Sequence, residues 1–154
     1  MPVYFKGSET HSVDSKGRVA IPAKIRRFIS PEAKNTLVVT RGVDKCIMCF
    51  PLDEWEIYSE NLRRLNIFNP TERYVLNVMN MWMDEVEMDS QSRIKLPAQL
   101  LKFAEIKDKV TVVGTGNHIT IWKPEEFEAY LSKTEEIYPY EKAVQEVFEM
   151  KPNE

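Results

Sequence analysis

The chain has 154 residues, a net charge of −3 and 43% hydrophobic residues, as expected for one ordinary globular domain or two very small ones. No apolar run approaches the roughly 20 residues of a membrane span, and no apolar signal segment follows the first residues, so we expect no membrane partner and a cytoplasmic protein. Two cysteines make no disulfide framework, which agrees with a reducing compartment.

Charge is unevenly distributed along the chain. Residues 1–50 carry 9 Lys and Arg against 4 Asp and Glu, a balance of +5. Residues 51–154 carry the remaining 12 basic residues against the remaining 20 acidic ones, a balance of −8. A basic segment in an acidic chain indicates an anionic partner for that segment.

The first predicted elements surround a polar turn at residues 14–18. Apolar and polar residues alternate over residues 11–13 and 19–21, which predicts a hairpin-like pair of strands. Pro22 suits the first position of a short helix, whose apolar stripe consists of Ile25, Phe28 and Ile29.

Two further strands are expected at residues 37–40 and 46–50, followed by an acidic helix start after Pro51. The dipeptide Asn69-Pro70 then opens a longer helix. One face of that helix is apolar, and it consists of Val75, Val78, Met79 and Trp82.

The same elements then return, because residues 89–103 repeat residues 14–28. Asp, Ser, Arg, Pro, Ala and Phe recur in place, where about one match is expected by chance. Alternating residues around the second turn, a helix after Pro97 and strands at 110–113 and 119–122 complete the second copy. The repeat predicts an α+β protein of two tandem units, closed by a helix near residues 140–148.

The Asp-x-x-x-Arg turn of each copy carries the candidate chemistry. Asp14 at the turn entrance can accept backbone N–H groups, and Gly17 supplies the positive φ that a tight turn commonly needs. Lys16 at the tip and Arg18 at the exit suit phosphate oxygens or the O6 and N7 edge of guanine. A turn held by a local Asp–Arg ion pair is the alternative for a single copy.

Duplication favours the binding interpretation, since two presented arginines can meet two phosphates or two bases. The second copy contributes Asp89 as its turn-structuring residue, with Arg93 and Lys95 as DNA contacts. Basic neighbours strengthen the first copy only, and these further DNA contacts are Lys24, Arg26 and Arg27, the last two on phosphates.

A wider set of residues carries a resemblance to a known family. In the first half these are Phe5, Gly7, His11, Asp14, Lys16, Gly17, Arg18, Pro22, Thr40, Gly42 and Trp55. In the second half they are Asp89, Arg93, Ile94, Leu96, Pro97, Gly116, Asn117, Ile119, Ile121 and Trp122. From residue 4 to about residue 131 the chain resembles the MraZ family, which belongs with the AbrB/SpoVT swapped-hairpin transcription factors.

The resemblance implies two tandem swapped-hairpin AbrB-like β-barrel repeats, at 8–55 and 83–126, with connecting helices at 56–82 and C-terminal helices at 127–154. It also implies a nucleoid-associated transcriptional regulator that forms a homo-oligomeric ring. Such a ring would bind repeated boxes of double-stranded DNA upstream of its own division and cell-wall gene cluster. Two residues depart from the family pattern: Ser92 replaces a glycine and Leu101 an arginine, and both changes are expected to weaken the second copy as a DNA contact.

Other constellations are weaker. Cys46 and Cys49 have C-x-x-C spacing but lie in a strand pattern without a second pair, so we expect neither zinc nor redox chemistry. The two histidines are interpreted as structural. Glu85, Glu87 and Asp89 would share a strand face, yet a solvated face explains them better than a nuclease Mg²⁺ site.

No nucleophile elbow, phosphate loop or dinucleotide motif is present, so the sequence predicts no enzyme, cofactor, metal or small-molecule substrate. The alternative to a DNA-binding regulator is a ring-forming interaction protein whose basic patch binds an acidic partner. An enzyme that uses the acidic cluster comes third.

Overall fold

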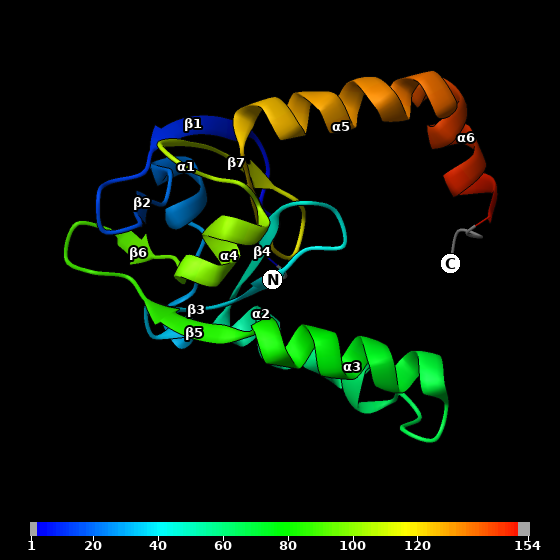
Figure 1. The fold of residues 1–154 in the computed structure, drawn as a ribbon, viewed down its shortest axis with the longest axis horizontal. Coiled ribbons are helices and arrows are strands. Elements are labelled where there is room, and N and C mark those ends of the chain that lie inside the picture. Colours follow the sequence, from blue (N-terminus) through cyan, green and yellow to red (C-terminus); the bar gives the residue numbers. More distant parts are fainter. Residues whose placement is uncertain (1–2, 151–154) are drawn as a thin grey trace. The chain divides into compact units, whose positions relative to one another are not determined.

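The computed structural model describes residues 3–150 and divides into two compact units, one ending at Lys123 and one beginning at Pro124. The first unit contains, in chain order, β1 (Ser8–Ser12), β2 (Arg18–Ala20), α1 (Ala23–Arg26), a 3₁₀ turn η1 (Pro31–Ala33), β3 (Thr36–Arg41), β4 (Ile47–Pro51), α2 (Leu52–Arg63), α3 (Pro70–Trp82), β5 (Asp84–Glu87), β6 (Arg93–Lys95), α4 (Ala98–Phe103), β7 (Lys109–Gly114) and β8 (Ile119–Trp122) (Figure 1). The second unit contains α5 (Pro124–Ile137) and α6 (Tyr140–Met150).

The main sheet of the first unit is built symmetrically from both repeats. Its six antiparallel strands follow the order β1-β7-β8-β4-β3-β5. Exchanging the repeats turns β1 into β5, β7 into β3 and β8 into β4, so the order reads the same from either edge. This confirms the prediction of an α+β protein made of two tandem repeats.

The two repeats exchange strands, as the resemblance to swapped-hairpin proteins implies. Within the first copy, the strands around the turn share only an isolated bridge between Val13 and Val19. Instead β1 pairs with β7, β5 pairs with β3, and β2 pairs with β6 in a separate two-stranded ribbon. The alternation predicted the strands but not their partners, because periodicity does not identify the partner strand.

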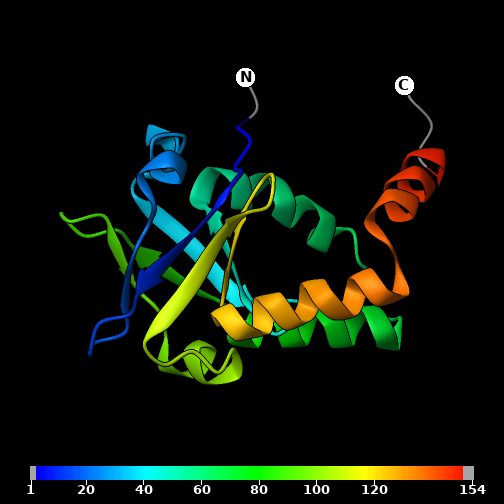
Figure 2. The same ribbon diagram turned by 90° about the horizontal axis from the view of Figure 1, so that it is seen from above.

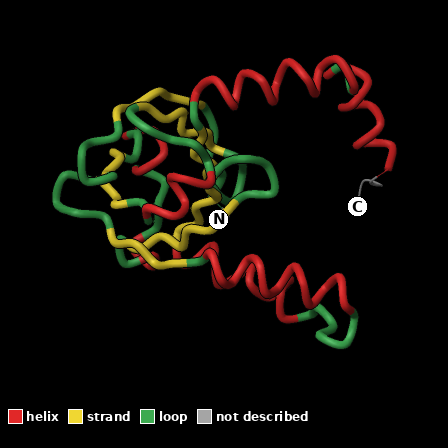
Figure 3. Tube along the Cα trace, in the orientation of Figure 1, coloured by secondary structure: helices red, strands yellow, loops and turns green. Residues whose placement is uncertain are grey.

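The exchanged strands enclose one hydrophobic core. Val19 and Ile94 lie opposite each other in the β2–β6 ribbon, and both are fully buried. Ile25 of α1 and Leu100 of α4 occupy equivalent places in the same core cluster. Figure 3 shows these two short helices among the strands of the first unit. Neither repeat therefore has a core of its own, which explains why units of this size are stable together.

The helices begin close to where the sequence predicts. Pro22 and Pro97 are the N-caps of α1 and α4, one residue before the predicted first position. Asn69 caps α3 by accepting hydrogen bonds from the two amides that follow Pro70, as its sequence predicts. The stripe expected in the first helix is too long, because α1 ends at Arg26 and Phe28 beyond it is 41% exposed.

The helical segments outside this core keep apolar side chains at the surface. Val75 of α3 is 40% exposed, and neither α2 nor α3 contains a buried residue. In the C-terminal unit, α5 and α6 likewise bury no residue completely, and Phe148 is 70% exposed. Over residues 3–150, no helix combines the length and the apolar character needed to cross a membrane.

Candidate nucleic-acid interface

The first turn is organised by the carboxylate of Asp14. Its Oδ1 accepts hydrogen bonds from the backbone amides of Lys16 (2.9 Å) and Arg18 (2.8 Å), and its Oδ2 accepts one from Arg18 Nε at 2.6 Å. The Gly17 amide donates to the Asp14 carbonyl at 3.0 Å and closes the turn. The local ion pair and a contact with DNA are therefore compatible in this geometry. The ion pair uses only one of the five guanidinium donors, and the other four are left for a further partner.

The second turn repeats this arrangement atom for atom. Asp89 Oδ1 accepts from the amides of Gln91 (2.8 Å) and Arg93 (3.0 Å), and Asp89 Oδ2 accepts from Arg93 Nε at 2.9 Å. Ser92 occupies the glycine position with a φ of 61°, close to the 80° of Gly17. The departure from the family pattern therefore leaves the turn geometry intact, at the expense of a strained serine.

These bonds alter the acidity of both carboxyl groups. The backbone hydrogen bond from Arg18 is the largest influence on Asp14 and helps to lower its pKa to about 2. The corresponding bond from Arg93 lowers the pKa of Asp89. Both carboxylates are consequently charged at neutral pH, and each holds its arginine in a fixed orientation.

The β2–β6 ribbon combines the two turns into one surface. Arg18 lies opposite Lys95, and Arg93 lies opposite Ala20. Directly opposite residues of an antiparallel pair share a face, so Arg18, Lys95 and Arg93 face away from the buried Val19–Ile94 pair. The two views in Figures 1 and 2 place both turns at the same end of the first unit.

A contact across the ribbon shows how close the turns are. Arg93 Nη1 lies 3.9 Å from Asp14 Oδ2, so the second arginine approaches the carboxylate of the first turn. The exposed Lys16 stands at the tip of the first turn, where the second has Gln91. The result is a two-stranded ribbon with four cations, which the major groove of DNA is wide enough to admit.

The three predicted cations of the first helix point to different surroundings. Lys24 Nζ donates to the Ser8 carbonyl at 3.2 Å and lies 3.8 Å from a Glu9 carboxylate oxygen. Arg27 stacks over the ring of its neighbour Phe28, 4.8 Å from the centroid. The sequence grouped these cations with the first turn, but the structure does not bring them together as one cluster.

Arg26 of the first copy lies beside the second turn, where it lines a groove with Ser90 and Ser92. The Ile21 amide donates to the Ser92 carbonyl at 3.0 Å, so the chain leading into α1 crosses to the second turn. Reciprocally, the Leu96 amide donates to the Gly17 carbonyl at 3.0 Å, which takes α4 to the first turn. Leu101 accordingly adjoins the first turn.

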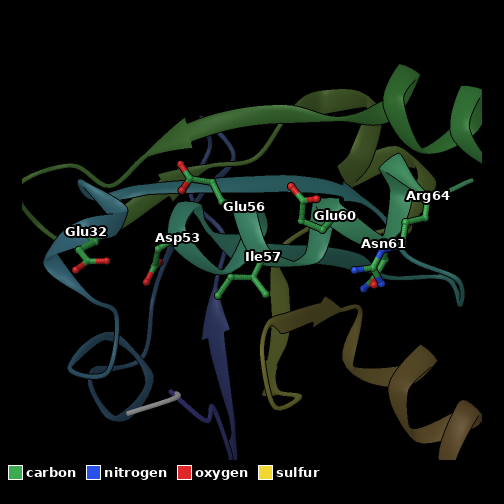
Figure 4. Close-up of a pocket in the computed structure, with 7 residues that line it drawn as sticks. All are labelled: Glu32, Asp53, Glu56, Ile57, Glu60, Asn61 and Arg64. Carbon is green, nitrogen blue, oxygen red and sulfur yellow. The ribbon is translucent and has the colours of Figure 1, made fainter.

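A groove on α2 has the opposite charge. It is lined by Glu32, Asp53, Glu56, Ile57, Glu60, Asn61 and Arg64 (Figure 4). Four carboxylates against one guanidinium make this groove unfavourable for the phosphates of a nucleic acid.

The remaining constellations have structural explanations. Cys46 and Cys49 are free and buried, and burial raises the pKa of the Cys46 thiol to about 12. The His118 ring stacks on Phe50 with a centroid distance of 4.8 Å, and burial lowers the pKa of that histidine. The Nε2 atom of His11 lies 3.6 Å from Oε1 of Glu9. Within residues 3–150, no group of three or more His, Cys, Asp or Glu side chains is placed to hold a metal ion.

The acidic row expected on one strand face is shorter than its sequence indicates. Glu85 and Glu87 lie on the exposed edge strand β5, but Asp89 lies beyond its end. The Asp89 carboxylate is also occupied by the turn, where it accepts three hydrogen bonds. It is therefore not available as a third ligand for a cation.

Comparison with known proteins agrees with the internal repeat. The family model for the MraZ protein matches twice, over residues 4–78 and 79–147, and so covers nearly the whole chain. The chain belongs to the MraZ family. The family resemblance and the two-repeat fold predicted from the sequence are thereby confirmed.

Individual MraZ relatives match over most of their length. A protein of Natranaerobius thermophilus named "Transcriptional regulator MraZ" is 35% identical over 85% of this chain and 89% of its own. One of the same name from Halothermothrix orenii is 35% identical over 87% and 91%. A third, from a Marinomonas species, is 37% identical over 84% and 89%. MraZ is a family of transcriptional regulators and not of enzymes, which agrees with the sequence prediction for this chain.

Proposed function

We propose that this protein is a DNA-binding transcriptional regulator whose β2–β6 ribbon enters the major groove of double-stranded DNA. The observation that carries the proposal is the juxtaposition of Arg18, Lys95 and Arg93 on the outward face of the ribbon, with Lys16 at the tip. The names of the MraZ relatives support regulation of transcription. A protein with this function would work in the cytoplasm, in association with the nucleoid.

The carboxylates prepare the arginines for base recognition. Asp14 holds Arg18 through Nε at 2.6 Å, which leaves the two terminal nitrogens with four N–H donors. Such a pair of terminal nitrogens can donate to the O6 and N7 atoms of guanine, the commonest specific contact in the major groove. Since the orientation is already fixed by the turn, less side-chain entropy is lost on binding.

Specificity would come from several such ribbons acting together. One ribbon contacts few bases, so we propose that subunits assemble into a ring that binds repeated boxes upstream of the division and cell-wall gene cluster. Each additional engaged ribbon is then an intramolecular step with a high effective concentration. Tandem repeats that associate head to tail make a heterologous interface, and such an interface can close into a ring.

Exposed apolar side chains support assembly. An apolar groove on the first unit lies between α2, α3 and the β3–β4 turn, and it is lined partly by Val43, Tyr58, Tyr74 and Val75. Val43 is 96% exposed and Tyr74 is 68% exposed. Surfaces of this kind are typical of protein interfaces.

The proposal is tested by a salt titration of DNA binding. A fluorescent duplex with the sequence upstream of the protein's own gene cluster is compared with a scrambled duplex of equal length. We expect tighter binding to the first duplex and an affinity that falls steeply with salt. Light scattering at micromolar concentration should give a mass several times 18.0 kDa. Failure to bind either duplex at low salt would leave the interaction protein as the better interpretation, and a clean monomer would remove the ring.

A further inference from the structure

A polar groove adjoins the second turn, outside the face of the ribbon. It lies between that turn and the segment that runs from α1 through η1 to β3. Its polar lining consists of Arg26, Ser30, Lys34, Asn35, Ser90 and Ser92, together with Asp89. Two cations and several hydroxyl and amide groups thus surround one hollow.

The strand exchange forms this groove. The Ile21–Ser92 hydrogen bond ties the start of α1 to the second turn, and the Met88 amide donates to the Asn35 carbonyl at 2.7 Å. The groove is therefore composed of residues from both repeats. Arg26 Nη1 donates a hydrogen bond to the Ile21 carbonyl at 3.1 Å, so four of the five N–H donors of the guanidinium remain.

The negative charge of Asp89 is already compensated within the turn. Its two oxygens accept three hydrogen bonds, from Arg93 Nε and from two backbone amides. Lys34 is exposed, with a left-handed backbone φ of 54°, and its side chain belongs to the lining. The balance of the groove is accordingly cationic.

The equivalent position in the other half has a different character. The Val13 amide donates to the Asp108 carbonyl at 2.8 Å, so Asp108 corresponds to Asn35. Leu101 corresponds to Arg26, and Leu101 Cδ1 lies only 3.2 Å from the position that a Cβ on Gly17 would occupy. An apolar side chain and a carboxylate thus replace a guanidinium and an amide, so the equivalent place is less favourable for an anion.

We propose that the groove beside the second turn binds a backbone phosphate of the DNA, with Lys34 as a contact residue and Arg26 as its partner. The inference rests on the proposed DNA-binding function. A phosphate offers acceptor oxygens only, and it matches a lining of cationic and hydroxyl donors. The ribbon then contacts the bases while this groove fixes the position of the strand beside them.

The test compares Lys34→Gln with Lys107→Gln in the full chain. Lys107 precedes Asp108 as Lys34 precedes Asn35, and both lysines are exposed, so the two variants remove the same charge from equivalent places. The operator duplex is the one with the sequence upstream of the protein's own gene cluster. We expect Lys34→Gln to bind it several-fold more weakly and to lower the slope of log affinity against log salt by about one per engaged subunit. Lys107→Gln should keep the wild-type slope.

Two further variants and two structural controls make each outcome decisive. Lys34→Arg should keep the wild-type slope of log affinity against log salt, because it retains the positive charge at the same position. Asn35→Asp should weaken binding, because it places a carboxylate in the groove. Aspartate tolerates the backbone φ of 55° at this position, so the fold should not change. Circular dichroism and light scattering must show unchanged fold and mass.

The result that overturns the groove is an equal slope for Lys34→Gln and Lys107→Gln, while Arg18→Ala still loses affinity on the same duplex. If Arg18→Ala also binds like the wild type, the proposed function itself fails. The two failures are therefore distinguishable in one set of titrations.

Discussion

The first turn, residues 14–18, and the second turn, residues 89–93, hold their arginines by the same hydrogen bonds but stand in different surroundings. Beside the first lie Lys16 at the tip, Lys95 across the ribbon and the apolar Leu101. Beside the second lie Gln91 at the tip and a groove with two cations. From equal turns in unequal settings we infer a division of labour, in which both arginines face the bases, the first turn makes the stronger base contact, and only the second turn adds a groove suited to the DNA backbone.

This division depends on the exchange of strands. If each repeat folded by itself, the basic α1 would lie beside the first turn, and all strong contacts would belong to one half. Exchange carries Arg26 to the second turn instead, so cations are spread over both. A duplicated unit can thus diverge in sequence and still present one continuous surface.

The largest expected effect is that of Arg18→Ala on DNA affinity. The variant loses a base contact worth about 1–3 kcal/mol per subunit, and a ring would multiply that loss through avidity. The fold should persist, because Arg18 is partly exposed and its ion pair is local. Fluorescence anisotropy at fixed salt measures the loss. Arg63→Ala on α2, where the side chain is 79% exposed, is the matched control and should bind like the wild type.

A smaller loss is expected for Arg93→Ala. Its turn has Gln91 at the tip instead of lysine, while the proposed phosphate groove beside it remains intact in the variant. Binding to scrambled DNA should therefore fall less than binding to the operator duplex. Equal losses for Arg18→Ala and Arg93→Ala on the operator would abolish the division between the turns.

The local chemistry of the site was predictable from the sequence. Asp14 and Asp89 contact groups two and four residues further on, so the motif itself contains both partners. The positions of the strands and of the Asn69 cap were equally local. The repeat then implied that both turns have one geometry, and the structure agrees even where Ser92 replaces glycine.

The neighbourhood of the turns was not predictable from one sequence. Val19 pairs with Ile94, 75 residues later, and alternation carries no information about which strand is the partner. The sequence therefore could not show that Arg26 lies beside the second turn and Leu101 beside the first. The surroundings of a side chain on a helix as short as α1, such as that of Lys24, depend on which strands pair, and the sequence does not give that pairing.

The glycine positions of the two turns should respond oppositely to substitution. Gly17→Ala places a Cβ 3.2 Å from Leu101 Cδ1 and 3.4 Å from the Leu96 carbonyl at a φ of 80°, and we expect destabilisation by roughly 1–2 kcal/mol. Ser92→Gly relieves the strained φ but increases the freedom of the unfolded chain, so a stabilisation of at most about 1 kcal/mol is expected. Urea unfolding measures both; a Gly17→Ala protein as stable as the wild type would show that the first turn relaxes without cost.

The smallest expected effect is a dependence of stability on acid at the first turn. The folded pKa of Asp14, about 2, lies below the value of about 3.9 for an unperturbed aspartate. A carboxyl group with a lowered folded pKa contributes stability that is complete above the unfolded pKa and is lost as the pH falls through the folded one. The wild type should therefore lose more stability than Asp14→Asn between about pH 5 and about pH 3.

Comparison with the second turn sharpens this last prediction. The pKa of Asp89 is also lowered, so Asp89→Asn should show the same sign of change. The first turn should give the stronger pH dependence, because Asp14 also lies 3.9 Å from the guanidinium of Arg93, in addition to its own arginine. The measurement is the difference in urea midpoint between the two pH values for each variant. A larger dependence on Asp89 than on Asp14 would mean that the cross-ribbon contact does not exist in solution.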